Sequence, residues 1–412
     1  MQAQKTILVL VEQFGQGGAE RVAAMLAKML HDSGQFRVYL YAVNHTDTTT
    51  SLPSGLSTGW LNRRPAHGIL NKIAAYPKRW SALRKLKKQL AVDLTVSSLW
   101  PVDWINALTG RDKKVAIIQI NILNNEQNAM MVRFRRLVTA VYRRFDAIVL
   151  GGANLKSELT GFFRIDSEKL TVIQNPINTR LIDTNINEPV GDKLNTILTR
   201  YKICTAANRL HPIKNTEALI GIYKLLENRK DVRFLVIGEG EEKDRIKKTI
   251  EQAGLKWSQI EDGRFDEQAH FYFLNFQNNI HNIISRSKIF LFPTKGEGLP
   301  LGLLEAMYSG VPVVVSDCPN GGISEAMEAK QPFDIARPRT VPERTEGGYL
   351  MPVPLEHESI LQWKEKIEEI LNMEAGTVES LKNGGRSIAM KFDQEKIKLQ
   401  WIGLFNNILN EK

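Results

Sequence analysis

The stretch KIFLFPTKGEGLPLGLLEAMYSGVPVVVSD, residues 288–317, decides how this chain folds. It opens with the apolar run Ile289–Phe292, which is typical of a buried strand. A second apolar run, Val311–Val315, predicts another strand, and between the two we expect a helix that begins near Pro300 and stops at Gly310. Strand, loop, helix and strand form a βαβ unit. The loop of such a unit lies at the carboxyl end of a parallel sheet, where these folds bind ligands.

The loop of this unit carries chemistry suited to a phosphate flanked by hydroxyl groups. At the amino terminus of the helix, the N–H groups of Gly298, Leu299 and Leu301 would face outward and favour an anion. The carboxylates of Glu297 and Glu305 cannot both bind that anion, but each can accept hydrogen bonds from two vicinal hydroxyls. A phosphate flanked by polyols is a nucleotide sugar. The spacing alone equally allows a solvated loop charge at Glu297 and a surface helix residue at Glu305.

The same residues resemble the donor motif of a known family. Glu297, seven intervening residues and Glu305, embedded in EGLPLGLLEAMYSGVPVVVSD, resemble the E-x7-E motif of retaining GT-B glycosyltransferases, in particular glycosyltransferase family 4 (glycosyl transferases group 1). The resemblance implies an α/β chain with two Rossmann-like, doubly wound domains that face each other across a cleft. It also implies retaining, metal-independent transfer of a hexose from a nucleotide-diphosphate sugar.

Length and composition agree with a globular protein of two or three domains. The chain has 412 residues, of which 43% are hydrophobic and 24% charged. It contains no run of 18 apolar residues, so we predict no membrane-spanning helix. Cys204 and Cys318 give no disulfide framework or metal cluster, so a reducing cytoplasm fits. The first apolar run breaks at Glu12, and we interpret it as a strand and not as a signal peptide.

The first domain is expected over residues 1–178. Its first strand, Ile7–Val11, is followed by a glycine loop and an apolar helix, and alternating strands and helices then predict a mostly parallel sheet. The further strands are expected at Val38–Val43, Leu94–Ser97, Val115–Ile120, Ala147–Leu150 and Leu170–Ile173. The segment GGAERV resembles the opening of the family, which implies that Gly17 and Gly18 lie against the donor phosphates. A lone glycine pattern of this kind can also serve only a tight turn.

A polar linker is expected over residues 179–195 and the donor domain over residues 196–385. The segment from Asn208 to Asn215 resembles the family's G-R-L…K-[GN] motif, which implies that Arg209 and Lys214 hold the donor diphosphate. Fixed cations would stabilise the charge that the leaving group gains in the transition state. Neither residue could act from a solvated surface, so we expect both to be buried.

The resemblance also suggests contacts for the nucleobase and for the sugar. FLNFQNN resembles the family's loop against the base, which makes Phe276 and Gln277 candidates for the base pocket. Many relatives carry a first-domain histidine that contacts the sugar, but this chain has Asn121 there. Residues 386–412 are expected to form a terminal helix that crosses back to the first domain.

The positive charge of the chain is concentrated in its first part. Residues 1–180 contain 25 Lys and Arg against 12 Asp and Glu, a net charge of +13, whereas the remainder has −3. Two basic stretches, 71–90 and 130–144, predict amphipathic helices with a core-facing stripe and a solvated face. Such helices can also lie on an anionic membrane, at about 1 kcal/mol per basic residue, and relatives with lipid-linked acceptors often have them. Nucleic acid is not expected, because no recognition motif supports it.

The sequence therefore predicts a glycosyltransferase of bacterial-type surface polysaccharide or glycoconjugate synthesis, such as lipopolysaccharide or capsule. We expect it in the cytoplasm or peripheral on the inner face of the plasma membrane. The donor, a UDP- or GDP-linked sugar, is a substrate; we expect no cofactor and no metal. The acceptor is a glycan or a lipid-linked glycan. The alternatives are a GT-B nucleotide-sugar epimerase and a non-catalytic nucleotide-sugar-binding protein.

Overall fold

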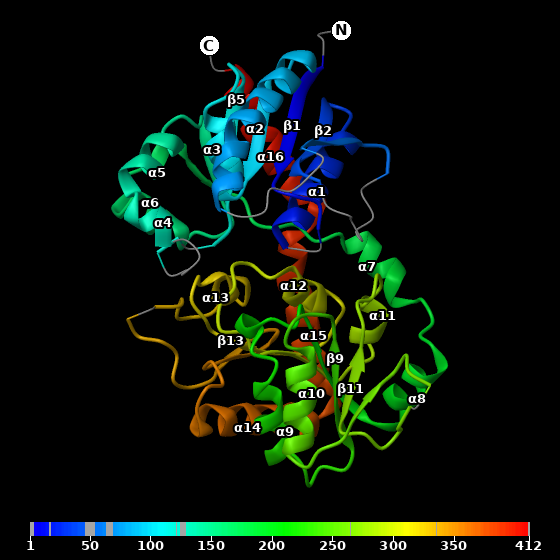
Figure 1. The fold of residues 1–412 in the computed structure, drawn as a ribbon. Helices are drawn as coiled ribbons and strands as arrows, with labels where there is room; N and C mark the ends of the chain where they lie inside the picture. The colour runs from blue at the N-terminus through cyan, green and yellow to red at the C-terminus, as the bar shows by residue number, and fades with distance from the viewer. Residues whose placement is uncertain are drawn as a thin grey trace. The chain divides into compact units, whose positions relative to one another are not determined.

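The chain folds into two compact units. The computed structural model describes residues 4–15, 18–45, 54–62, 69–120, 122–123, 129–263, 265–334 and 336–410. One unit consists of Met1–Pro176 together with Gln394–Lys412, and the other of Ile177–Asp393. Figure 1 shows the elements of both units.

The first unit is built on a parallel sheet of seven strands in the order β3-β2-β1-β4-β5-β6-β7. Its strands are β1 (Lys5–Val11), β2 (Phe36–Asn44), β3 (Ser57–Asn62), β4 (Leu94–Ser98), β5 (Lys113–Ile118), β6 (Ala147–Leu150) and β7 (Leu170–Val172). Its helices are α1 (Gly18–Asp32), α2 (Ile69–Gln89), α3 (Trp100–Ala107), α4 (Ala129–Arg133), α5 (Arg135–Tyr142), α6 (Leu155–Gly161) and α16 (Gln394–Asn410).

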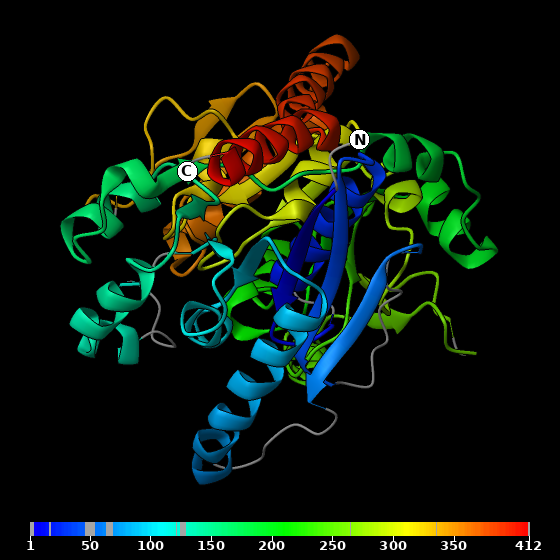
Figure 2. The ribbon, with the colours of Figure 1, turned by 90° about the horizontal axis from the view of Figure 1, so that it is seen from above.

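Helices cover both faces of this sheet, because its strands are apolar on both sides. Along β1, Ile7 and Val9 pack with α1 and α16, whereas Leu8 and Leu10 pack with α2 and α3. Figure 2 shows α16 and α2 on opposite sides of β1. Helices α4, α5 and α6 cover the same face as α3 farther along the sheet.

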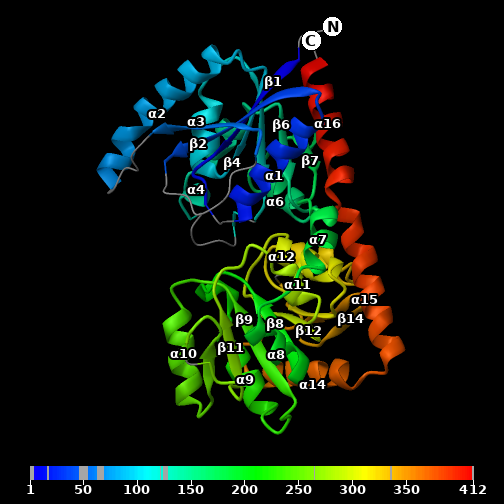
Figure 3. The ribbon, with the colours of Figure 1, turned by 90° about the vertical axis from the view of Figure 1, so that its right-hand side faces the viewer.

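Helix α16 completes the core of the first unit from the far end of the sequence. Trp401 and Phe405 are buried against it, and the Phe405 ring meets that of Phe36 edge-on, with 6.0 Å between the ring centroids. In Figure 3, α16 lies beside α1 and the strands of this unit.

The second unit has a sheet of eight strands in the order β10-β11-β9-β8-β12-β13-β15-β14, parallel except for the pair β14–β15. Its strands are β8 (Lys202–Ala207), β9 (Val232–Ile237), β10 (Trp257–Gln259), β11 (Phe271–Leu274), β12 (Ile289–Phe292), β13 (Val313–Ser316), β14 (Glu343–Thr345) and β15 (Gly348–Met351). Its helices are α7 (Thr179–Ile186), α8 (Asp192–Arg200), α9 (Ala218–Leu225), α10 (Lys243–Gln252), α11 (His281–Ile284), α12 (Leu301–Tyr308), α13 (Gly322–Ala326), α14 (His357–Asn372) and α15 (Ala375–Ala389). The predicted pair of doubly wound, Rossmann-like domains is confirmed.

Three predicted boundaries differ from the structure. Residues 179–195 do not form a linker, because they carry α7 and the start of α8 within the second unit. Asp183 of α7 accepts a hydrogen bond from Tyr308 at 2.9 Å and pairs with Arg386 at 2.7 Å, which ties α7 to α12 and α15. The first unit ends at Pro176, two residues before the predicted end. The return to the first unit begins at Gln394, and residues 386–393 belong to the second unit.

The two basic stretches also differ from the expected pair of uniform amphipathic helices. In α2, Arg79 is buried and donates to Asn44 at 2.8 Å, and Lys87 is buried beside Asp112. The second stretch breaks at Phe134 into α4 and α5. Part of the basic charge of α2 therefore belongs to the interior of the first unit and not to its surface.

Lys87 lies in a buried polar network beneath α2. Its Nζ is 2.9 Å from Asp112 Oδ2 and donates to Asn106 at 2.6 Å, while Thr95 donates to the same Asp112 oxygen. Burial lowers the pKa of Lys87 to about 8, and the Asp112 carboxylate opposes that shift. Removing one partner of such a pair leaves a buried charge without its main compensation.

We therefore expect Lys87→Met to lower the free energy of unfolding of the first unit by about 3 kcal/mol, the lower end of the range for breaking a buried pair. The lower end applies because Lys114 stays within 3.8 Å of Asp112. Urea unfolding followed by tryptophan fluorescence measures the change. Lys85→Met, at an exposed position of the same helix, is the control and should stay within about 0.5 kcal/mol of wild type. Equal stability of the two variants would contradict the account.

Candidate functional site

The predicted donor residues of the second unit lie at one edge of its sheet. Arg209 and Lys214 follow β8, Phe276 and Gln277 follow β11, and Glu297 follows β12. These three strands are linked in one sheet through parallel pairings, so their carboxyl ends meet at the same edge. The edge is where open α/β sheets bind their ligands.

Two hydrogen bonds fasten the turn after β8 to the loop after β12. The backbone carbonyl of Ile213 accepts from the N–H of Lys295 at 2.7 Å and from the hydroxyl of Thr294 at 3.0 Å. Ile213 lies in the short 3₁₀ helix Pro212–Lys214. A cation and a carboxylate from distant parts of the sequence are thereby brought together.

Lys214 and Glu297 form an ion pair at this junction. Their side chains are only 20% and 18% exposed, and the Lys214 ammonium lies 5.6 Å from the centre of the Phe292 ring. Burial lowers the pKa of Lys214 to about 8. The pair therefore presents a cation at neutral pH that is poorly solvated and suited to an anionic ligand.

The loop beyond Glu297 runs closely over α13 before it enters α12. A Cβ atom on Gly322 would lie 2.2 Å from the carbonyl oxygen of Gly298, so only glycine allows this approach. Leu299 and Leu301 are 6% and 7% exposed and anchor the amino end of α12. Pro300 immediately precedes the helix instead of lying in its first turn.

Helix α12 carries Glu305 on its buried side. Glu305 is 3% exposed, and its carboxylate lies 3.9 Å from the His281 Nε2 of α11. The interpretation of Glu305 as a surface residue is therefore wrong. His281 was not among the predicted site residues; the available signal was its position two residues beyond FLNFQNN, the segment expected against the base.

Arg209 differs from the expectation of burial. Its side chain is 72% exposed and lies 3.4 Å from Glu241, which is also 3.5 Å from His211. Exposed ion pairs of this kind are worth about 0–1 kcal/mol, so the pair with Glu241 holds Arg209 only weakly. The side chain of Lys214 is mostly but not fully buried, whereas that of Arg209 is exposed, so the expected burial is wrong for Arg209 and only partly met by Lys214.

The loop after β11 presents an aromatic ring and an amide. Phe276 is 49% exposed, and the Gln277 amide donates to the Asn275 carbonyl at 3.2 Å. The Asn275 side chain accepts from Lys243 at 2.6 Å and from Gln259 at 2.9 Å, which fixes the base of the loop. These bonds hold the residue that precedes the exposed ring.

The candidate residues of the first unit are only partly described. Gly17 and Asn121 lie outside the described residues. Gly18 is the first residue of α1, is exposed, and has open space where a Cβ would stand. The geometry at Gly18 does not require glycine for close packing.

Comparison with known proteins gives the family of this chain. A model described as "Glycosyltransferase Family 4" matches residues 16–181, and one described as "Glycosyl transferases group 1" matches residues 192–387. The chain belongs to this family of GT-B glycosyltransferases. Its fold is similar to that of Anabaena HepE in complex with UDP and glucose, at a TM-score of 0.70 and 16% identity over 98% of this chain and all of that one.

Individual relatives share less of the sequence. A UDP-Gal:alpha-D-GlcNAc-diphosphoundecaprenol alpha-1,3-galactosyltransferase of Escherichia coli is 30% identical over 159 residues, 37% of this chain and 38% of that protein. A GalNAc-alpha-(1->4)-GalNAc-alpha-(1->3)-diNAcBac-PP-undecaprenol alpha-1,4-N-acetyl-D-galactosaminyltransferase of Campylobacter jejuni is 22% identical over 98% of this chain and 99% of that protein. Among curated relatives that match well, including the Escherichia coli enzyme, this chain spans only 36% to 60% of the length of the relative.

Proposed function

We propose that this protein transfers a sugar from a nucleotide-diphosphate sugar to an acceptor hydroxyl with retention of the anomeric configuration. The observation that carries the proposal is the poorly solvated Lys214–Glu297 pair at the amino end of α12. It combines a cation for a diphosphate with a carboxylate for sugar hydroxyls at the ligand-binding edge of the sheet.

Each residue has a role in this proposal. The donor diphosphate takes Lys214 away from Glu297 and approaches Gly298, Leu299 and Leu301 at the amino end of α12. Glu297 is then free to accept hydrogen bonds from the sugar. Glu305 accepts from the ribose hydroxyls.

The other contacts of the donor come from exposed side chains. Phe276 offers a face on which the base can stack, and Gln277 can hydrogen-bond its edge. Arg209 is solvated in the free protein, so it acts on the diphosphate only once it has turned from Glu241 and is enclosed with the donor; breaking its exposed ion pair costs little. The resemblance to the family also implies donor contacts from Gly17 and Gly18 and a sugar contact from Asn121; Gly17 and Asn121 lie outside the described residues.

The chemistry needs neither a cofactor nor a metal in this proposal. The acceptor oxygen bonds to the anomeric carbon as the bond from that carbon to the nucleoside diphosphate breaks on the same face. The acceptor proton passes to an oxygen of the leaving phosphate. Lys214, Arg209 and the positive end of the α12 dipole stabilise the charge that the leaving group gains.

The relatives suggest the substrates. UDP-linked galactose is named for the Escherichia coli relative, and undecaprenol-diphosphate acceptors are named for both relatives. We infer a UDP-linked hexose as donor and a lipid-linked glycan as acceptor, in the assembly of a bacterial surface polysaccharide or glycoconjugate.

None of the helices in the described residues has the length and the apolar character that crossing a membrane requires.

A surface of the first unit suits contact with a lipid-linked acceptor. The α4–α5 patch consists of the exposed residues Met130, Arg133, Phe134, Arg135, Arg136, Leu137, Arg143 and Arg144. Met130 is 64% exposed, Phe134 47% and Leu137 48%, and residues 129–144 contain five arginines and no acidic residue. Apolar side chains surrounded by arginines are the composition of a helix that lies in an anionic membrane interface. We therefore assign the proposed membrane contact to this patch in preference to α2.

The donor site is tested by a thermal-shift screen against UDP-, GDP-, ADP- and dTDP-sugars. A ligand at about 100 times its dissociation constant adds about 2.7 kcal/mol of stability. We expect one nucleotide class, UDP, to stabilise the wild type and Glu305→Gln to weaken its binding about 10- to 100-fold, because the variant lacks a charged acceptor. Glu365→Gln, an exposed carboxylate of α14, should bind like wild type.

Equal binding by the Glu305→Gln variant would contradict the donor site. Chemical conversion of the bound donor in the absence of an acceptor would support the epimerase alternative. Binding without transfer to any lipid-linked acceptor would support a nucleotide-sugar-binding protein.

The membrane contact is tested by co-sedimentation with vesicles of phosphatidylglycerol and of phosphatidylcholine. We expect binding to the anionic vesicles, with a loss of at least about tenfold in the double variant Phe134→Ser/Leu137→Ser, because two apolar anchors are removed. Leu355→Ser/Leu399→Ser removes two leucines that are 62% and 67% exposed elsewhere and is the matched control. A similar loss in both double variants would contradict the assignment of the contact to the α4–α5 patch.

A further inference from the structure

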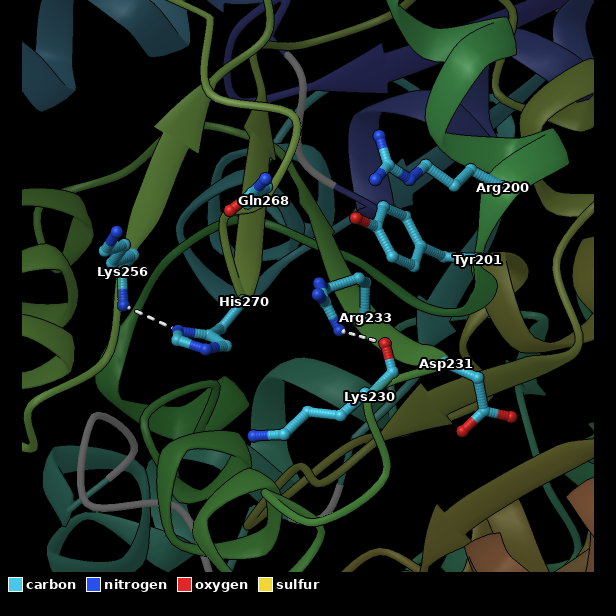
Figure 4. A pocket seen from close by; sticks show the side chains of 8 residues that line it. All are labelled: Arg200, Tyr201, Lys230, Asp231, Arg233, Lys256, Gln268 and His270. Carbon is cyan, nitrogen blue, oxygen red and sulfur yellow. Dashed lines mark hydrogen bonds between the residues drawn. The ribbon is translucent and has the colours of Figure 1, made fainter.

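A basic hollow lies in the second unit away from the donor residues. It has a volume of ≈ 720 Å³ and is lined by Arg200, Tyr201, Lys230, Asp231, Arg233, Lys256, Gln268 and His270. Figure 4 shows these side chains around the guanidinium of Arg233. We call this site the basic hollow.

The sheet topology separates the basic hollow from the donor site. Tyr201, Asp231 and His270 directly precede β8, β9 and β11, and Lys256 precedes β10. These strands are parallel, so the hollow lies at their amino ends and the donor residues lie at the carboxyl ends. The six residues of β8 put about 20 Å between the two edges.

The hollow contains more positive charge than its carboxylates compensate. Asp231 pairs with Lys202 at 3.1 Å and with Arg229 at 3.0 Å, and Arg200 pairs with Glu267 at 3.1 Å. In the part of the chain that the structure describes, Lys230, Lys256 and Arg233 form no ion pair. Three cations therefore face the hollow without a carboxylate of their own.

Arg233 is the buried cation of this group. It is 7% exposed, and its guanidinium is stacked 4.2 Å from the centre of the Tyr201 ring. Its Nη1 donates to the carbonyls of Lys230 at 2.9 Å and Val232 at 2.7 Å, but its buried Nε has no hydrogen-bond partner among the described residues. A buried charge with an unused donor is costly unless a ligand compensates it.

His270 adds a further donor. Its Nδ1 accepts from the backbone N–H of Lys256 at 2.8 Å, so the neutral ring carries its proton on Nε2. Burial lowers the pKa of His270, and Arg233, Lys230 and Lys256 lower it further, while Glu227 acts in the opposite direction. The field at this position is therefore positive, and the neutral ring offers its Nε2–H as a donor while Nδ1 keeps its bond from Lys256.

We propose that the basic hollow is a second ligand site, which binds a phosphate monoester group through Arg233, Lys230, Lys256 and His270. A phosphate dianion matches the several cations, and the guanidinium and imidazole N–H groups are directional donors for its oxygens. The group comes either from a free small molecule or from the headgroup of a lipid. The site is independent of the donor site.

The test is a titration of the full chain labelled with nitrogen-15 at histidine. Glycerol 3-phosphate is the free probe, and vesicles containing phosphatidic acid, followed by co-sedimentation, are the lipid probe. We expect the His270 resonance, assigned with His270→Asn, to shift to a saturating value. The double variant Lys230→Gln/Lys256→Gln should weaken binding of the probe at least about tenfold.

Two control variants establish whether the binding belongs to the basic hollow. Lys248→Gln/Lys330→Gln removes two exposed charges elsewhere in the same unit and should leave binding within about twofold of wild type. Lys214→Gln should also leave binding of the phosphate probe unchanged, even if it weakens binding of the nucleotide sugar. Saturable binding of a probe that Lys230→Gln/Lys256→Gln weakens and both controls retain supports the site. The probe that binds in this way identifies the source of the phosphate. No binding of either probe, or a loss in either control equal to that in Lys230→Gln/Lys256→Gln, would overturn it.

Discussion

The parallel pairing of strands in the second unit determines where its polar groups can gather. Parallel strands begin at one edge and end at the other, so the loops of successive βαβ units converge on two separate rims. At the carboxyl rim, the Ile213 carbonyl fastens Lys214 to the loop that carries Glu297. At the amino rim, the residues before the strands gather into the basic hollow. One constraint of topology thus places the proposed donor site and the proposed phosphate site at opposite edges of the same sheet.

The carboxyl rim depends on backbone contacts that only glycine permits. Gly238 has φ +139°, and a Cβ there would lie 2.0 Å from the carbonyl oxygen of Asn208; Gly240 stands in the same relation to Leu210, at 2.2 Å. These contacts hold the turn that carries Arg209 and Lys214 against the loop after β9. Gly322 does the same for the loop at Gly298. The positions of Lys214 and Glu297 therefore follow from close packing of backbone.

The sequence predicted those strands and helices whose apolar run and whose Pro or Gly boundary lie within or beside the element itself. The apolar runs of β12 and β13, with Pro300 and Gly310 between them, gave the βαβ unit nearly to the residue. The strands β3, β10, β11, β14 and β15 were missed. Four of them have only three or four residues, which carry too little periodicity, and β3 has only two large apolar residues, Trp60 and Leu61. Residues 179–195 contain few apolar side chains and were interpreted as a linker, although Ile182 and Leu194 are buried.

The side-chain environments depend on tertiary contacts that spacing does not encode. Lys87 lies four residues beyond Leu83, so it continues the buried stripe of α2 and is neutralised by Asp112. The exposure of Arg209 and the approach of His281 to Glu305 likewise depend on neighbours distant in sequence. The donor-site prediction came from the resemblance of the motifs, and its physical support is the burial of Glu305 and the partial burial of the Lys214–Glu297 pair.

The most direct measurement is the structure of the full chain bound to the nucleotide that stabilises it most. The account predicts that the diphosphate lies against the Lys214 ammonium and the amino end of α12, with Glu297 released from its ion pair and the ribose hydroxyls on Glu305. A nucleotide whose phosphates lie in the basic hollow, or lie elsewhere without contacting Lys214, would contradict it.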